Sequence, residues 1–129
     1  MIRKKNVFLL LLILVIFIGG VFMVIVQNKS PVVENFKSSD YQYYIDNFSS
    51  EENVGSIIDA KDAIKKSEII WIKLYGENIK KEKPFKVFYD AKSEIWLVQG
   101  TLRSNMMGGV ANILIDNDTG KVLAVWHDK

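Results

Sequence analysis

The hydrophobic residues of this chain follow three different spacings along its length. Residues 7–26 form an unbroken apolar run in which only Gly19 and Gly20 lack a bulky side chain. As a helix rising about 1.5 Å per residue, such a run spans about 30 Å, the thickness of the hydrocarbon core of a bilayer. Residues 7–26 are therefore predicted to form a transmembrane helix. The basic residues 3–5 before it predict a cytoplasmic N-terminus, with the rest of the chain outside.

Two interpretations of this apolar run are open, a retained signal anchor and a cleaved signal peptide. The apolar core of a signal peptide usually has about 7–15 residues and ends in small residues at the cleavage site. The run here is longer, and residues 22–27 offer no such site, which favours a retained anchor. The expected order is a basic cytoplasmic N-terminus at 1–6, a single-pass anchor in the cytoplasmic membrane at 7–26, a tether with a possible short helix at 27–53 and an extracytoplasmic domain at 54–129.

The second spacing is helical. Tyr41, Tyr44, Ile45 and Phe48 recur at the period of one helix face, which predicts a short helix over about 40–48. A longer helix is predicted over about 60–75, with Asp59 as its N-cap and Gly76 at its end. Its expected inner face comprises Ala60, Ala63, Ile64, Ser67, Trp71 and Leu74.

The third spacing is a period of two residues, in which successive side chains of a β-strand point to opposite faces. Strands are predicted at residues 85–89, 94–102, 110–116 and 121–126, with turns at 90–93 and 117–120. In the second strand Trp96, Val98 and Gly100 share one face. The element order predicts an α+β fold in which one main helix lies across a four-stranded antiparallel sheet.

Charge and composition narrow the possible partners. Residues 1–30 hold four of the 17 basic residues and no acid, so the rest of the chain has 13 basic and 15 acidic residues. This near-neutral domain lacks the basic stripe of a nucleic-acid binder, and no nucleic-acid partner is expected. The chain has no cysteine, which excludes disulfides, thiolate catalysis and cysteine-ligated metals.

The chemically reactive side chains do not form a catalytic set. His127 is the only histidine, and a catalytic base needs a nucleophile or a polarised substrate within hydrogen-bond reach. Asp116 and Asp118 flank a turn without the longer ligand pattern of an EF-type calcium loop. We therefore expect no catalytic residue, no cofactor, no metal and no small-molecule substrate. A protein-binding function is expected instead.

A spaced series of aromatic residues, glycines and turn residues runs through the C-terminal part of the chain. Its members are expected to be mostly structural and are Tyr75, Gly76, Pro84, Phe85, Trp96, Gly100, Thr101, Gly108, Gly109, Gly120 and His127. Together they resemble the pattern of bacterial immunity proteins with a nuclear transport factor 2-like fold, which are found beside polymorphic toxins. The resemblance covers roughly residues 54–129 and implies a cystatin-like or nuclear transport factor 2-like helix-on-sheet domain.

This resemblance implies a non-enzymatic protein that binds and neutralises a cognate toxin. With the predicted topology, the two proteins would meet outside the cytoplasmic membrane, although a long anchor is not expected of a cytoplasmic immunity protein. In the loop between the strands predicted at 94–102 and 110–116, Arg103, Met106 and Met107 are the candidate contacts with the partner. Methionine adapts to irregular surfaces, and arginine is enriched at interfaces.

A second resemblance leaves an alternative function open. The segment from Ile115 to Val122 resembles the end of PepSY-type domains, which are small extracytoplasmic modules proposed to restrain peptidases and are often membrane-tethered. The alternative is therefore a membrane-tethered PepSY-like module that restrains a peptidase or acts in sensing. Tyr75-Gly76, Trp96 and Gly108-Gly109 favour the immunity proteins, whereas the anchor favours the PepSY-type domains.

Overall fold

A computed structural model describes residues 30–105 and 107–129, and its folded unit runs from Pro31 to Lys129. Within these residues, no helix combines the length and the apolar character needed to cross a membrane. The transmembrane helix predicted at residues 7–26 and the N-terminal segment 1–6 lie outside the described residues.

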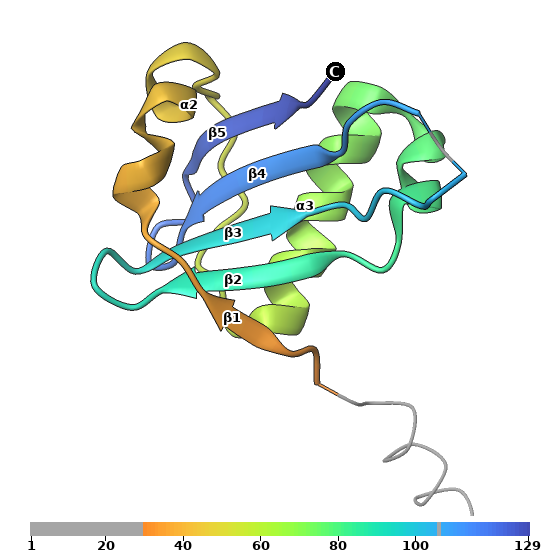
Figure 1. The fold of residues 1–129 in the computed structure, drawn as a ribbon. Coiled ribbons are helices and arrows are strands. Elements are labelled where there is room, and N and C mark those ends of the chain that lie inside the picture. Colours follow the sequence, from red (N-terminus) through yellow and green to blue (C-terminus); the bar gives the residue numbers. More distant parts are fainter. Residues whose placement is uncertain (1–29, 106) are drawn as a thin grey trace, which may run out of the picture. The chain divides into compact units, whose positions relative to one another are not determined.

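One five-stranded sheet forms the centre of the domain (Figure 1). The strands lie side by side in sequence order, with β1 parallel to β2 and the other neighbours antiparallel. They are β1 (Val33–Asn35), β2 (Lys86–Asp90), β3 (Ile95–Gln99), β4 (Ala111–Asp116) and β5 (Val122–His127). The strands from β2 to β5 correspond to the four that the alternation predicts, joined at 91–94 and 117–120 by tight turns.

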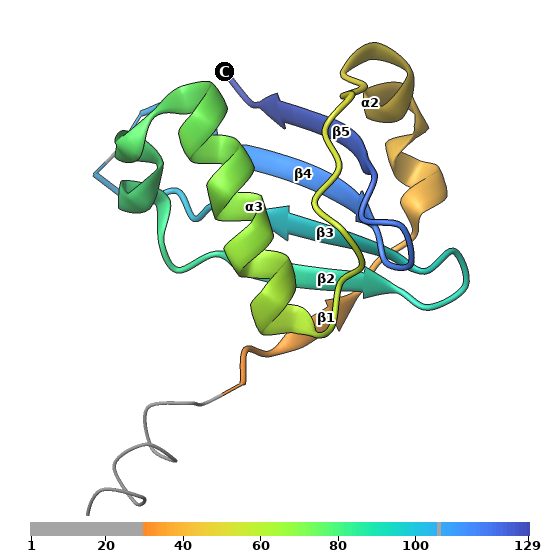
Figure 2. The same ribbon diagram turned by 180° about the vertical axis from the view of Figure 1, so that it is seen from behind.

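The main helix, α3 (Ala60–Tyr75), has the predicted bounds and crosses one face of the sheet (Figure 2). The Asp59 carboxylate accepts a hydrogen bond from the Asp62 backbone nitrogen at 2.8 Å, which caps the first turn. Gly76 ends the helix with φ +84°, a conformation that favours glycine. Trp71 is fully buried beneath the helix and packs edge-to-face on Phe85, with ring centroids 5.1 Å apart. Leu74, predicted to face inward, is about half exposed.

The other sheet face is covered by residues that precede α3. Here a 3-10 helix, η1 (Ser38–Tyr41), leads into α2 (Gln42–Asn47), close to the short helix predicted over 40–48. Tyr44 stacks on Trp126 of β5 at a centroid distance of 4.1 Å, and Phe36, Tyr41 and Ile45 belong to the same cluster, which includes Leu97 and Leu114 of the sheet. Because both faces are packed, the sheet does not present one open face to a partner.

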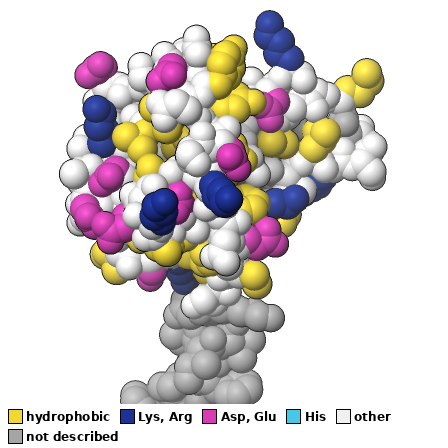
Figure 3. Space-filling view, turned by 60° about the vertical axis from the view of Figure 1, so that its left-hand side comes forward, with side chains coloured by type: hydrophobic (Ala, Val, Ile, Leu, Met, Phe, Trp, Pro, Cys, Tyr) yellow, Lys and Arg dark blue, Asp and Glu magenta, His cyan; other side chains and the backbone are white. Residues whose placement is uncertain are grey.

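The side of the domain that carries α2 also exposes hydrophobic side chains. Tyr43 and Phe48 are partly exposed, and hydrophobic side chains are visible between acidic and basic ones in Figure 3. Single exposed hydrophobic residues are common on protein surfaces.

Two features of the predicted fold need correction. The sheet is mixed and five-stranded rather than antiparallel and four-stranded, because β1 adds a parallel edge strand. The folded domain, predicted to begin at Val54, begins at Pro31 because residues 31–53 pack against the sheet instead of forming a tether. The three residues of β1 are all exposed, so they carry no alternation that could reveal a strand.

The two predicted faces of β3 are confirmed. Trp96 and Val98 pack in the core below α3, whereas Leu97 packs in the cluster on the opposite face. Trp96 is 8% exposed, and its indole nitrogen donates a hydrogen bond to the Asn117 side-chain oxygen at 2.8 Å. Gly120 lies at the same end of the sheet, in the turn between β4 and β5. Its backbone oxygen accepts a hydrogen bond from the Val54 nitrogen at 2.9 Å.

Candidate functional site

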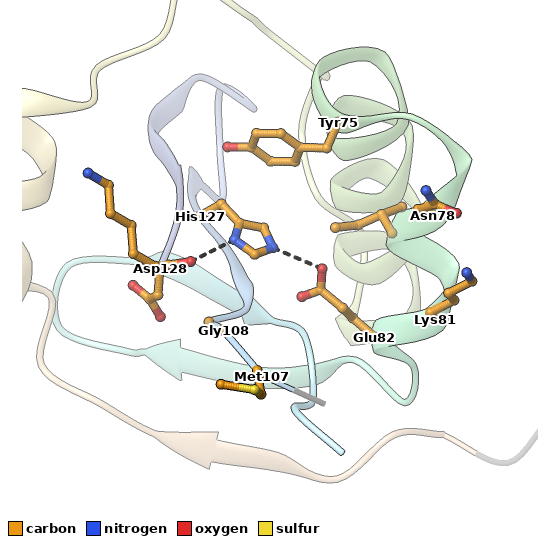
Figure 4. Close-up of a pocket in the computed structure, with 11 residues that line it drawn as sticks. Tyr75, Asn78, Lys81, Glu82, Met107, Gly108, His127 and Asp128 are labelled. Carbon is orange, nitrogen blue, oxygen red and sulfur yellow. Dashed lines mark hydrogen bonds and ion pairs between the residues drawn. The ribbon is translucent and has the colours of Figure 1, made fainter. Parts of the chain in front are cut away.

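A pocket of about 440 Å³ opens at the end of the sheet where β3 and β5 finish and β4 begins (Figure 4). The end of α3 and the following 3-10 helix η2 (Glu77–Glu82) form its second wall. The lining residues are Tyr75, Asn78, Ile79, Lys81, Glu82, Met107, Gly108, Gly109, His127, Asp128 and Lys129. Four residues of the predicted motif, Tyr75, Gly108, Gly109 and His127, therefore meet in one place.

Glu82 connects the segments that form this pocket. Its Oε1 atom accepts a hydrogen bond from the Ala111 backbone nitrogen at 2.7 Å, and its Oε2 atom lies 3.0 Å from Nε2 of His127. Its backbone oxygen accepts a hydrogen bond from the Thr101 nitrogen at 2.7 Å. The side chain is buried, and its two partners from β4 and β5 compensate for its loss of water.

Two motif glycines make room for acidic neighbours. A Cβ atom on Gly100 would lie 2.4 Å from Oε1 of Glu82, and one on Gly109 would lie 2.2 Å from Cβ of Asp128. Contacts this short do not occur between real side chains, so both positions need glycine for close approach. The two glycines thus allow the backbone to approach Glu82 and Asp128 closely.

His127 lies between two hydrogen-bond acceptors. Its Nδ1 atom is 2.8 Å from the Asp128 backbone oxygen, and its Nε2 atom faces the Glu82 carboxylate. A neutral imidazole donates from only one nitrogen, so both contacts are satisfied only when the ring is protonated. Burial opposes the charge, but the hydrogen bonds and negative charges of Asp128 and Glu82 outweigh it and raise the pKa of His127 above 6.5. The Tyr75 ring packs edge-on against this imidazole at 5.6 Å.

A second hydrogen-bond network anchors Asp128. The fully buried Asn112 donates to Asp128 Oδ2 at 3.2 Å and to the Val110 backbone oxygen at 2.9 Å. Asn112 Oδ1 accepts a hydrogen bond from Gln99 at 2.7 Å. The indole nitrogen of Trp126 donates to Asp128 Oδ1 at 3.1 Å. Both carboxylate oxygens of Asp128 are therefore engaged within the domain.

The arrangement does not suit acid–base catalysis. Both nitrogens of His127 contact protein acceptors, so neither is available to a substrate. The Thr101 hydroxyl donates to the Pro84 backbone oxygen at 2.5 Å and is not activated by the histidine. In the part of the chain that the structure describes, no group of three or more His, Cys, Asp or Glu side chains has an arrangement that could hold a metal ion.

The loop between β3 and β4 forms the rim of the pocket. Met107 lines it and is 99% exposed, so its side chain makes almost no contact with the domain. Arg103 is also exposed but is not a lining residue, and Met106 lies outside the described residues. Of the three predicted partner contacts, the structure thus places one at the pocket.

The other motif residues are distributed over the fold. Phe85 lies in the core under α3, and Trp96 and Gly120 lie at the far end of the sheet. Sequence reasoning missed Glu82, Asn112 and Asp128. Asn112 carried a usable signal, since a single polar residue inside the apolar run of β4 is buried only when its amide is hydrogen-bonded.

Comparison with known proteins gives one family match. A family model described as NTF2 fold immunity protein matches residues 62–129. This range contains every residue that lines the pocket and leaves out β1, η1 and α2. The chain has no significant match among curated proteins or solved structures.

Proposed function

Since this chain belongs to the family of NTF2 fold immunity proteins, we propose that it neutralises a protein toxin by binding it directly. Immunity proteins of this family are typically non-enzymatic, and the engaged nitrogens of His127 fit a binding function. Of the two resemblances found in the sequence, the family match is to the immunity proteins. The PepSY-like alternative gains no support from the site.

The observation that carries the proposal is the match of residues 62–129 to the NTF2 fold immunity family. Met107, which is almost completely exposed at the rim of the pocket, is the candidate contact. Exposing an apolar side chain of this size to water is unfavourable, and a binding partner would remove that cost. Arg103 and Leu102 of the same loop are also exposed, which places apolar and cationic groups together. Arginine is among the residues that most often dominate the binding energy of an interface.

We place the encounter outside the cytoplasmic membrane. The support is the apolar run at residues 7–26 with basic residues before it, which favours a retained anchor and an outward C-terminal domain. N-terminal sequencing and the intact mass of membrane-purified protein test this topology. A mature chain that starts near Gln27 would contradict the retained anchor.

Co-expression with a candidate toxin encoded by a neighbouring gene tests neutralisation. We expect the wild-type protein to restore growth and the Arg103→Ala/Met106→Ala/Met107→Ala variant to restore it much less. The matched control is Ile58→Ala/Lys65→Ala/Ile69→Ala, which removes one cation and two exposed apolar side chains from the region of α3.

The result separates three cases. Loss of rescue in the loop variant alone supports the loop as the contact surface. Equal rescue by both variants removes the loop from the interface. Absence of rescue with the wild-type protein, together with inhibition of a neighbouring peptidase, would favour the PepSY-like function instead.

A further inference from the structure

Both ends of the loop between β3 and β4, residues 100–110, are held by Glu82. The Thr101 backbone nitrogen donates a hydrogen bond to the Glu82 backbone oxygen, and the Ala111 nitrogen donates one to Oε1 of the Glu82 side chain, both at 2.7 Å. Gly100 lies so close to Glu82 that a Cβ atom there would collide with the carboxylate. One residue at the end of η2 therefore fixes where this loop leaves β3 and where it enters β4.

The middle of the β3–β4 loop has no comparable support. Among its described residues, 102–105 and 107–109, none forms a hydrogen bond or an ion pair with the rest of the domain. Arg103 and Met107 are exposed. Because the hydrogen bonds lie at the two ends of the loop, the direction in which these two side chains project depends on how the ends are held.

Glu82 is held in turn by His127. The Glu82 side chain is buried, and its Oε2 atom forms an ion pair with Nε2 of His127 at 3.0 Å when the imidazole is protonated. Figure 4 shows the Glu82 carboxylate directed at the imidazole, whereas Lys81 of the same segment points away from it. Hydrogen bonds between charged groups are stronger than those between neutral groups. The protonated histidine thus fixes the carboxylate that accepts the hydrogen bond from Ala111.

We propose that Glu82 is a positioning residue for toxin binding, which holds the β3–β4 loop so that Arg103 and Met107 meet the toxin. The ion pair with His127 keeps Glu82 in place. This inference rests on the proposed function, since Arg103 and Met107 are the proposed contacts. Because Glu82 is buried, it acts through the two ends of the loop and does not touch the toxin itself.

Toxin binding should therefore depend on the charge of His127. The titratable side chains that line the pocket around it are Tyr75, Lys81, Glu82, Asp128 and Lys129. On β4, its strand partner Ala111 carries no charge. Glu82 and Asp128 favour the protonated imidazole, and the two lysines oppose it. When the pH rises and His127 loses its proton, the Glu82 carboxylate keeps only its hydrogen bond from Ala111, so the affinity for the toxin should fall.

Amide hydrogen exchange of the full-length protein tests the support of the loop without the toxin. In Glu82→Ala the Ala111 amide loses its acceptor, so its exchange should become at least about tenfold faster relative to the amides in the middle of β4. The {¹H}-¹⁵N NOE values of Arg103 and Met107 should fall. Glu82→Gln keeps an oxygen acceptor and should change both quantities less. The matched control is Glu77→Ala, which removes an exposed glutamate of the same 3-10 helix.

Calorimetry with the toxin that the co-expression assay identifies tests the effect on binding. Glu82→Ala should weaken binding about tenfold near pH 6, whereas Glu77→Ala should bind as the wild type does. From about pH 6 to about pH 9 the wild-type affinity should fall severalfold. Glu82→Gln should lack this fall, because its neutral amide forms no ion pair with His127. Groups of the toxin titrate equally in both measurements, so the difference between the two proteins isolates this contact.

The two experiments fail in distinguishable ways. If the wild-type protein binds no candidate toxin, the proposed function is overturned, and hydrogen exchange still decides whether Glu82 holds the loop. If hydrogen exchange and NOE values in Glu82→Ala equal those of the wild type, or if this variant binds the toxin equally well, the positioning role is overturned and the immunity function stands. If the affinity of Glu82→Gln falls with pH as the wild type does, the role of the ion pair is overturned. Thermal unfolding shows whether each variant folds, and if Glu82→Ala does not, the comparison of Glu82→Gln with the wild type decides.

Discussion

Ser38 donates two hydrogen bonds to one carboxylate oxygen of Asp90, from its backbone nitrogen at 2.8 Å and from its hydroxyl at 2.7 Å. The two residues are 52 positions apart in the sequence. Asp90 ends β2, and Ser38 begins the helical turn that leads to α2. This contact therefore fixes the segment that covers the second face of the sheet.

The Asp90 contact predicts a specific dependence of stability on pH. Hydrogen bonds from Ser38 hold the pKa of Asp90 at about 2, below its ordinary value of 3.8. Because the folded pKa is depressed, the stabilisation is complete above about pH 4 and is lost as the pH falls towards 2. Urea unfolding of wild-type and Asp90→Asn protein should show a stability difference that shrinks across this window. A difference that is constant from pH 5 to pH 2 would contradict the assignment.

A second prediction concerns the space between Gly100 and Glu82. Gly100→Ala should reduce the free energy of unfolding by about 1–3 kcal/mol, the usual cost of overpacking a filled site. The new Cβ atom would otherwise lie 2.4 Å from Oε1 and 2.9 Å from Cβ of Glu82. In a Glu82→Ala background the obstructing carboxylate is absent, so the same substitution should cost less. Denaturant unfolding of the wild type, the two single variants and the double variant gives the coupling free energy between the two positions. Strictly additive changes in the free energy of unfolding would contradict the steric explanation.

The elements predicted correctly from the sequence are those with local signals. The apolar face of α3 lies between the Asp59 cap and Gly76, and the apolar strands of both hairpins are separated by short polar turns. β1 could not be predicted in this way, because its three residues are exposed and its partner β2 lies about fifty positions away. Only the tertiary fold makes that segment a strand.

The functional site was predicted only in part, for a similar reason. The glycines and His127 stand out by residue type, but Glu82 lies in a lysine-rich segment that is typical of an exposed surface. Its burial depends on Ala111 and His127, which reach it from β4 and β5. A sequence pattern shows which residues are unusual for their position, and Glu82 becomes unusual only when these distant partners surround it.

A third prediction tests the core below α3. Trp96→Ala should cost about 3–5 kcal/mol of stability, the range for removing a buried aromatic side chain. The ring is 8% exposed, packs on Tyr89 at 4.5 Å and donates a hydrogen bond to Asn117. The control is Ile58→Ala, at a side chain that is 85% exposed, which should change stability by no more than about 0.5 kcal/mol. A change in stability near zero for Trp96→Ala would show that this ring does not belong to the core.

The last prediction uses the fact that His127 is the only histidine in the chain. Its imidazole proton signals are therefore unambiguous in an NMR titration of the full-length protein. We expect a midpoint above 6.5, because the Asp128 backbone oxygen and the Glu82 carboxylate favour the protonated ring more than burial opposes it. Glu82→Gln keeps the size of the side chain but removes its charge, so the midpoint should fall.

The contact between Glu82 and His127 also determines how the stability of the protein changes with pH. Since the pKa of His127 is raised in the folded state, its stabilisation is complete below about pH 6.5 and is lost as the pH rises through the folded value. His127→Phe removes the titrating group, so its stability difference from the wild type should shrink over that range. A wild-type midpoint at or below 6.5, or one unchanged by Glu82→Gln, would show that the Glu82–His127 contact is not an ion pair in solution.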